Sequence, residues 1–211
     1  MHSLGSGRGA DRKWRPARLG QGEGPRNRRV DTGPGKTKNA RRMAEPKKAA
    51  ASGPKPTAPL RTEHASIMTR LTGLAERIET LHESATLDQM SLAREVLDFV
   101  NTNVAPHARA EEYTLYPAAD WAAGEGSKLT ETARFEHQLV AKRCQALEKE
   151  ISAGAAAGRL MHHCYGILGL IAAHFQVTDQ VLLPYLDKAF DAARFEKEVL
   201  TPLRVERNTK R

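Results

Sequence analysis

The sequence has few cysteines and no long apolar run. Two cysteines among 211 residues cannot form a disulfide scaffold, and Cys144 and Cys164 lack the close spacing of a zinc knuckle. No apolar run reaches the ~18 residues that a membrane span needs, and the N-terminus has no apolar stretch that resembles a secretory signal. We therefore expect a soluble, cytoplasmic protein in a reducing compartment, without a membrane partner.

The excess of basic charge belongs to the N-terminal part of the chain. The formal net charge is +8, but residues 1–60 hold 15 Lys and Arg against 4 Asp and Glu, a net of +11, which leaves −3 for 61–211. Residues 1–59 are rich in Gly, Pro, Arg, Lys and Ala and have no apolar period. Such a segment cannot bury enough surface to offset chain entropy, so we expect a disordered basic leader.

Met43 opens the sequence Met-Ala-Glu-Pro-Lys-Lys, which reads like a natural bacterial start. We hypothesise that 1–42 is an upstream extension from a misplaced start codon. The alternative is a basic arm that binds nucleic acid or acidic surfaces, which we hold as the minor interpretation.

From Leu60 onward, apolar residues recur at three- and four-residue spacing, which is typical of amphipathic helices. Breaks in this pattern delimit four helices, predicted over 60–83, 88–122, 128–152 and 158–188. Short connections between long amphipathic helices indicate antiparallel neighbours, so 60–188 is predicted to be an all-α, up-down four-helix bundle. In the C-terminal segment 189–211, we expect a short fifth helix over 189–203 that packs outside the bundle, and a tail.

The polar residues of this bundle form an internal repeat. The first half carries Glu63-His64, His107, Glu112, Leu115 and Pro117, and the second half carries Glu136-His137, His174, Asp179, Leu182 and Pro184. In each half the second His lies ten residues before the Pro, with an acidic residue at His+5 and Leu at His+8. Each half therefore reads as one helical hairpin, and the two hairpins would pair about a pseudo-twofold axis.

Hairpin geometry predicts that four histidines meet at one level of the bundle. His64 and His107 lie 22 and 21 residues from the first turn, and His137 and His174 lie 19 and 18 residues from the second. At ~1.5 Å per residue, these offsets are nearly equal within each hairpin. A buried imidazole without a partner is costly, whereas imidazoles and carboxylates around cations satisfy each other. Glu111, four residues after His107, can reach the same site.

Other candidate residues have plainer interpretations. His82 lies ~27 Å along its helix from His64, too far to join the same site. We interpret His82, His162 and His163 as solvated or satisfied histidines, Cys144 as a packing residue, Glu112 as an outer or surface residue, and Tyr113, Tyr116 and Trp121 as core or rim aromatics. A redox-active tyrosine beside a metal centre stays open as an alternative.

Together these residues resemble the hemerythrin-like (HHE cation-binding) family. The resemblance covers 60–187 and rests on Glu63-His64, His107-xxx-Glu111-Glu112-xx-Leu-Tyr-Pro117, Glu136-His137 and His174-xxxx-Asp179-xx-Leu-Leu-Pro184. It implies a four-helix bundle that holds two non-haem iron ions with an oxo or hydroxo bridge. Carried over by position, the terminal ligands would be His64, His107, His137 and His174, and Glu111 would be one bridging carboxylate.

The chain departs from the family pattern at two positions. Many bacterial members have Glu four residues after the last His, where this chain has Thr178, and the oxygen carriers use Asp one residue later, where Asp179 lies. The resemblance therefore implies Asp179 as the second bridge. The oxygen carriers also have a His where this chain has Ala133. The open metal positions that result favour redox chemistry or sensing over reversible oxygen carriage.

Three functions follow as hypotheses. The first is a di-iron protein that binds or turns over a small oxidant such as O₂, NO or H₂O₂. The second is metal or redox sensing, storage or signalling without turnover, and the third is a degenerate bundle that lacks the second bridging carboxylate. Manganese and zinc stay open as alternative metals, because His/carboxylate sites also accept them. The sequence does not determine whether the protein is an enzyme, nor its oligomeric state.

Overall fold

The computed structural model describes residues 54–81 and 86–209, so His82 and residues 1–53 of the leader predicted over 1–59 lie outside these ranges. The described residues are helical and include no strand, as predicted. The first helical stretch is α1 (Ala58–Thr80), and the second joins α2 (Thr86–Phe99), a π-helical turn at Val100–Val104, α3 (Ala105–Ala110), a π-helical turn at Glu111–Leu115 and α4 (Tyr116–Ala123). The third is α5 (Glu131–Ser152), and the fourth joins α6 (Ala157–Val177), a π-helical turn at Thr178–Leu182 and α7 (Leu183–Ala189). The last joins α8 (Ala192–Phe195), a π-helical turn at Glu196–Leu200 and α9 (Thr201–Asn208).

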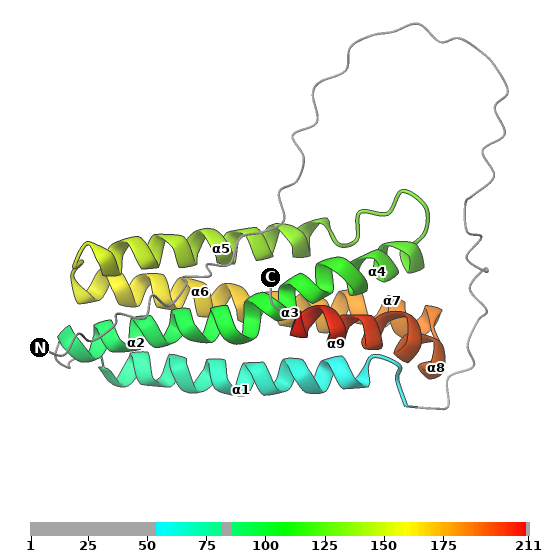
Figure 1. The fold of residues 1–211 in the computed structure, drawn as a ribbon, viewed down its shortest axis with the longest axis horizontal. Helices are drawn as coiled ribbons and strands as arrows, with labels where there is room; N and C mark the ends of the chain where they lie inside the picture. Colours follow the sequence, from blue (N-terminus) through cyan, green and yellow to red (C-terminus); the bar gives the residue numbers. More distant parts are fainter. Residues whose placement is uncertain (1–53, 82–85, 210–211) are drawn as a thin grey trace, which may run out of the picture.

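The first four stretches lie side by side and alternate in direction (Figure 1). The α5–α6 connection lies at one end of the molecule, and the α4–α5 connection lies at the other (Figure 1). Helix α6 contacts α1, α2 and α5. The ends of these four stretches differ from the predicted ends by at most three residues. The two halves of the repeat are therefore brought together along their whole length.

Each π-helical turn ends two residues before a proline. The turns at Val100–Val104, Glu111–Leu115, Thr178–Leu182 and Glu196–Leu200 precede Pro106, Pro117, Pro184 and Pro202. A proline inside a helix lacks an N–H, and its ring clashes with the carbonyl four residues earlier, so the helix widens locally instead of ending. The turns at 111–115 and 178–182 hold the positions that follow His107 and His174 by four and five residues.

Two apolar clusters lie on either side of a polar layer. The first cluster includes Ile78, Leu92, Leu147 and Ile167, and the second includes Leu115, Tyr116, Leu183 and Phe195. On each of the four stretches, one histidine lies between members of the two clusters: His64, His107, His137 and His174. The polar layer is therefore enclosed by apolar side chains along the bundle.

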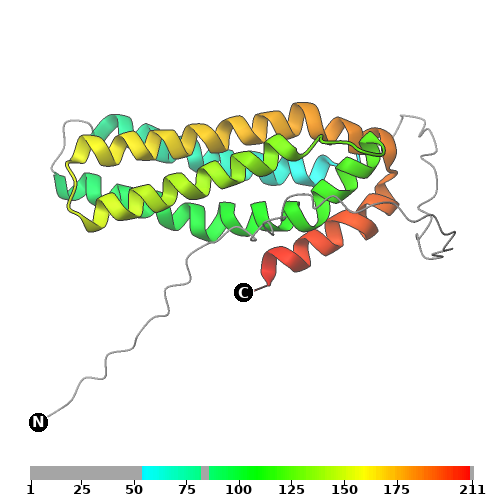
Figure 2. The ribbon, with the colours of Figure 1, turned by 90° about the horizontal axis from the view of Figure 1, so that it is seen from above.

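The C-terminal stretch is longer and packs more deeply than the sequence predicted. It runs to Asn208 and not to 203, and Phe195, Val199 and Leu203 are buried in the second cluster. Helix α9 contacts α3 and the turn Glu111–Leu115, and it lies along one side of the bundle (Figure 2). It is therefore part of the folded body, because its apolar side chains complete that cluster.

The first helix begins within the segment that we assigned to the leader. Thr57 is buried, and its backbone N–H and hydroxyl donate to Asp187 Oδ1 at 3.1 and 2.8 Å. Pro59 lies in the first turn of α1, where its missing N–H costs no hydrogen bond. The contact with Asp187 connects this beginning to α7.

The stretch Ala157–Ala189 is long and apolar enough to cross a membrane by length and average hydropathy. It contains no uninterrupted apolar run of that length, because small and weakly polar residues lie between its apolar ones. Of its most apolar window, 44% is buried inside the protein, and a core helix gives the same signal. This signal is weak evidence for a membrane span.

Candidate metal centre

Four histidines from four different stretches meet in the polar layer. His64 of α1 and His107 of α3 place their Nε2 atoms 3.1 Å apart, and His137 of α5 and His174 of α6 place theirs 3.2 Å apart. All four side chains are buried, with exposures of 1–4%. The histidines that hairpin geometry predicted to converge do lie together.

Glu111 lies between the two pairs of histidines and is fully buried. Its Oε1 lies 3.3 and 3.6 Å from Nε2 of His107 and His64. Its Oε2 lies 3.3 and 3.4 Å from Nε2 of His137 and His174. Each oxygen of one carboxylate therefore faces one pair of imidazoles, which makes two groups of three side chains that could each hold a metal ion.

Each of the four histidines is held from outside by a carboxylate. A carboxylate only accepts hydrogen bonds, so Nδ1 of each imidazole carries a proton, and in the neutral imidazole Nε2 presents its lone pair to the centre. Carboxylates that orient metal-bound histidines act in this way. The four contacts are His64 to Asp179 at 2.7 Å, and His107 to Glu63, His137 to Glu112 and His174 to Glu136 at 2.9 Å.

The structure places Asp179 outside the two groups that could hold ions. Its Oδ1 contacts the outer nitrogen of His64, and its side chain is 30% exposed. Asp179 therefore contacts Nδ1 of His64 in the same way that Glu112 contacts Nδ1 of His137. One residue further along a helix turns a side chain by about 100°, so Asp179 diverges from Thr178, which follows His174 by four residues. Thr178 is buried, and its Oγ1 has no hydrogen-bond partner among the described residues.

Tyr116 belongs to the site, although we interpreted it as a core or rim aromatic. It is fully buried, and its hydroxyl donates to Glu111 Oε2 at 3.1 Å and lies 3.1 Å from His137 Nε2. The repeat contained a signal for this position, because Leu183 is the counterpart of Tyr116 in the second half. An asymmetric polar residue in an otherwise matched core pair points to a site.

Phe175 is a second residue that the sequence analysis missed. Its ring stacks on that of His64 with centroids 4.6 Å apart, and it lies 5.5 Å from the ring of His107. Its counterpart in the first half is Ala108, directly after His107. The two histidine pairs therefore have side chains of different size beside them.

The charges around the site favour a cation. Burial acts to lower the pKa of His107 and of His174, but Glu111 together with Glu63 or Glu136 outweighs it and raises both pKa values to about 9. Burial acts to raise the pKa of Glu111, but the histidines around it hold this pKa well below its usual value. Without metal, protons supply the positive charge that the carboxylates attract.

The donors present fit metal ions. Within each pair, the two Nε2 atoms lie 3.1 or 3.2 Å apart, so a proton or a shared cation is needed between them to relieve the repulsion of their lone pairs. Glu111 Oε1 is buried and has no hydrogen bond to any described residue. Nitrogen and carboxylate donors of this kind suit iron, manganese and zinc. Two imidazoles and one carboxylate oxygen per ion leave further positions for a small ligand.

The remaining candidates lie apart from the centre. His162 and His163 contact each other at the beginning of α6 and belong to neither group of potential ligands found among the described residues. Cys144 is buried in the first apolar cluster, as expected for a packing residue. Burial raises the pKa of its thiol to about 12, which makes it unreactive.

The fold and the site define a helical protein with a buried cluster of histidines and a carboxylate that could bind metal. A sequence model described as the hemerythrin HHE cation binding domain matches residues 55–186. The chain therefore belongs to the hemerythrin HHE cation-binding family, as the resemblance implied. No curated protein and no solved structure matches it significantly. The stretch from α8 to α9 lies beyond the matched residues.

Proposed function

We propose that this protein is a cytoplasmic di-iron protein that binds or reacts with a small oxidant, O₂, NO or H₂O₂. The supporting observation is the position of Glu111, whose two oxygens each face one pair of histidine Nε2 atoms. A carboxylate shared by two ions needs this arrangement. A single ion at one pair would leave the other pair of buried imidazoles without a cation. The up-down four-helix bundle of the family would hold these groups rigidly.

In this proposal the protein holds the two iron ions and orients their histidine ligands, and the ions supply the chemistry. His64, His107 and Glu111 Oε1 would hold one iron, and His137, His174 and Glu111 Oε2 would hold the other. When bound, iron supplies Lewis acidity and one-electron redox chemistry. The outer carboxylates keep each imidazole in the tautomer that presents Nε2. Apolar clusters on both sides of the layer exclude bulk water from it.

The position of Asp179 changes the proposed ligand set. Because Asp179 contacts the outer nitrogen of His64, we propose that it orients this histidine and does not bridge the ions. Thr178 then leaves the position opposite Glu111 without a carboxylate. With Ala133 in place of a further histidine, each ion would have few protein donors. Such a centre favours reaction with a ligand over simple reversible oxygen carriage.

The proposal is tested by reconstituting the full-length protein with ferrous iron under anaerobic conditions. We expect about two irons per chain, since the chain offers two groups of donors, and near-ultraviolet absorption of an oxidised di-iron centre after exposure to O₂. Peroxide or NO should then change the spectrum at stoichiometric amounts. Uptake of one iron or none, without this absorption, would contradict the proposal.

A second candidate is binding without turnover, in sensing, storage or signalling. The observation in its favour is Thr178, because a centre with one shared carboxylate holds its ions more weakly than a centre with two. Iron that exchanges readily with a chelator, without consumption of peroxide or NO, would favour this function. Sustained consumption of either oxidant in the presence of a reductant would exclude it.

A further inference from the structure

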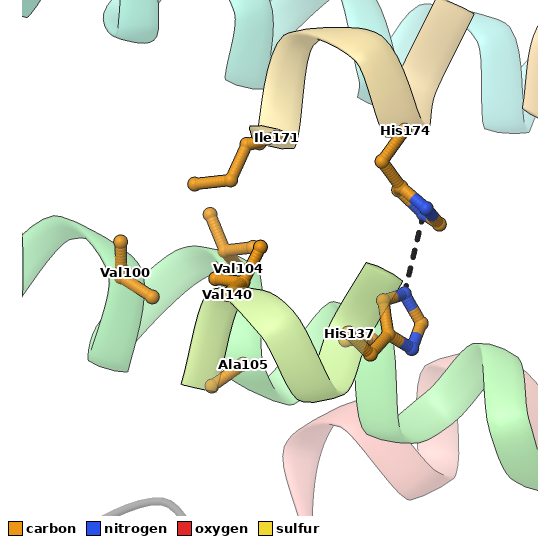
Figure 3. A pocket seen from close by; sticks show the side chains of 8 residues that line it. Val100, Val104, Ala105, His137, Val140, Ile171 and His174 are labelled. Carbon is orange, nitrogen blue, oxygen red and sulfur yellow. Dashed lines mark hydrogen bonds between the residues drawn. The ribbon is translucent and has the colours of Figure 1, made fainter. Parts of the chain in front are cut away.

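An apolar cavity lies beside one of the two histidine pairs. Its volume is about 20 Å³, and its walls include Val100, Val104, Ala108 and Val140 together with His137 and His174. Figure 3 shows the valine side chains grouped beside the contact between the two imidazoles. The exposed surface of its walls is apolar throughout. A space of roughly 10–15 Å³ is enough for one water-sized molecule, and apolar cavities of proteins stay dry and take up xenon.

Larger side chains stand at the corresponding positions beside the other pair. Phe175 takes the place of Ala108, and its ring packs against His64 and His107. Ile167 takes the place of Val100, and Ile67 takes the place of Val140. Both isoleucines are buried in the first apolar cluster. The two pairs of histidines therefore differ in accessible space, and Ala108 against Phe175 is the largest difference in side-chain volume.

The chemistry of the cavity selects among the candidate ligands. Apolar walls offer no hydrogen bonds, so they would make the desolvation of hydrogen peroxide or of an anion costly. O₂ and NO are uncharged, small and weakly hydrated, and they lose little on leaving water. The cavity therefore fits a diatomic gas better than a polar oxidant.

We propose that this cavity admits an uncharged diatomic molecule to the ion held by His137 and His174, and that Ala108 keeps it open. The inference rests on the proposed function for the presence of that ion, but the cavity itself does not depend on iron. The ion at His64 and His107, covered by Phe175, would then act without direct access from such a cavity.

Xenon tests the cavity independently of metal. Crystals of the metal-free full-length protein, pressurised with xenon, should show an atom between Ala108 and the two histidines. Ala108→Leu should remove it, with Ala108→Val as a milder variant if the first folds poorly. Phe175→Ala should create a second xenon site beside His64 and His107. Absence of xenon from the wild-type cavity would overturn the proposal whatever the iron content.

Binding of NO to the ferrous-loaded protein tests delivery to the ion. We expect Ala108→Leu to weaken or slow NO binding by about tenfold or more, because the ligand must displace a packed side chain, while iron content and circular dichroism stay unchanged. Ala93→Leu is the matched control, because it makes the same change at a buried position of the first apolar cluster outside the cavity walls, and it should leave this step unchanged. If Ala108→Leu took up iron and bound NO as the wild type does, the proposed role of the cavity would be overturned, and the proposed function would stand. A chain that takes up no iron would contradict the proposed function, and xenon would still show whether the cavity accepts an apolar molecule.

Discussion

The half from α1 to α4 and the half from α5 to α7 match in the groups that orient the histidines and differ in the groups that face the centre. Each half supplies two histidines and two outer carboxylates in the same relation. The inner differences are Glu111 against Thr178, Tyr116 against Leu183, and Ala108 against Phe175. The two halves are therefore alike in the groups that fix the imidazoles and unlike in the groups that would contact ions and ligands.

A physical reason accounts for this division. Every buried imidazole needs a partner at Nδ1, so all four outer carboxylates are required for orientation and charge balance. One carboxylate with two oxygens can serve two ions, so the second copy of the bridge is less strictly needed. Once the bridge comes from one half, the facing positions of the other half can take side chains of other size and polarity.

The largest effect is expected from Glu111→Gln. The amide keeps the shape but loses the charge shared by both groups, so we expect the affinity for both ions to fall by more than about 100-fold. Metal analysis after chelator competition measures this loss. Glu112→Gln is the comparison, because it changes one outer contact only and should weaken just the ion beside His137, by about 10–100-fold. Retention of both ions by Glu111→Gln would show that the carboxylate is not shared.

The pair Glu63→Gln and Glu136→Gln tests whether the outer groups are equivalent. Each glutamate precedes one histidine and holds another, His107 or His174. We expect each change to weaken one of two binding steps by about 10–100-fold, the usual effect of removing such a carboxylate. Stepwise titration with Co²⁺, followed by its visible spectrum, measures both steps. A loss of both steps in one variant would refute the independence of the two groups.

Thr178→Glu tests the inner difference directly. A carboxylate opposite Glu111 would add charge and a second bridge, so we expect about tenfold tighter binding of iron. Asp179→Asn is the comparison and should weaken binding by loosening His64. If Thr178→Glu changed nothing while Asp179→Asn removed one bridge-dependent ion, Asp179 would be the second bridge after all.

Stability against pH should fall on the alkaline side in the metal-free protein. The pKa values of His107 and His174 are raised to about 9 in the folded state, above their unfolded values of about 6.5. Their stabilisation is therefore present below pH ~6.5 and is lost as pH rises through about 9, a loss on the order of several kcal/mol for the two histidines together.

Urea unfolding at several pH values measures this loss. His107→Gln and His174→Gln should each remove a similar part of the slope, because the two halves contribute one such histidine each. Bound metal requires neutral imidazoles, so metal affinity should instead rise over the same range. A metal-free protein with flat stability from pH 6 to pH 9 would contradict the charge balance described for the site.

The smallest effect is expected from Arg207→Gln. Arg207 of α9 pairs with Glu63, on the oxygen that accepts from His107, and no described arginine side chain pairs with Glu136 in this way. Removing it should change the affinity of one ion by a few-fold, about the size of a partly exposed ion pair. Arg204→Gln is the matched control, because Arg204 of α9 pairs with Glu196 instead. If both changes altered the affinity equally, the effect would come from a less stable α9 and not from the contact with Glu63.

The helices and the meeting of the four histidines followed from periodicity and hairpin length. The lengths of the hairpins, closed by short connections, set the level at which His64, His107, His137 and His174 meet. The direction of Asp179 did not follow, because neighbouring helical positions diverge by about 100° and the proline-linked π-helical turns alter the local path. Tyr116 looked like an ordinary core residue until its hydroxyl was placed beside Glu111.

By itself, the sequence determined the all-helical body, the repeat and the residues able to form a metal site, because these depend on local spacing and on the chemistry of the side chains. The tertiary structure decided which carboxylates face inward, that α9 reaches Glu63 and that a cavity lies beside one histidine pair. Those features arise from packing between distant segments, where volume and direction act together. Ala108 and Phe175 occupy equivalent positions in the repeat, and only their surroundings show that one leaves space and the other fills it.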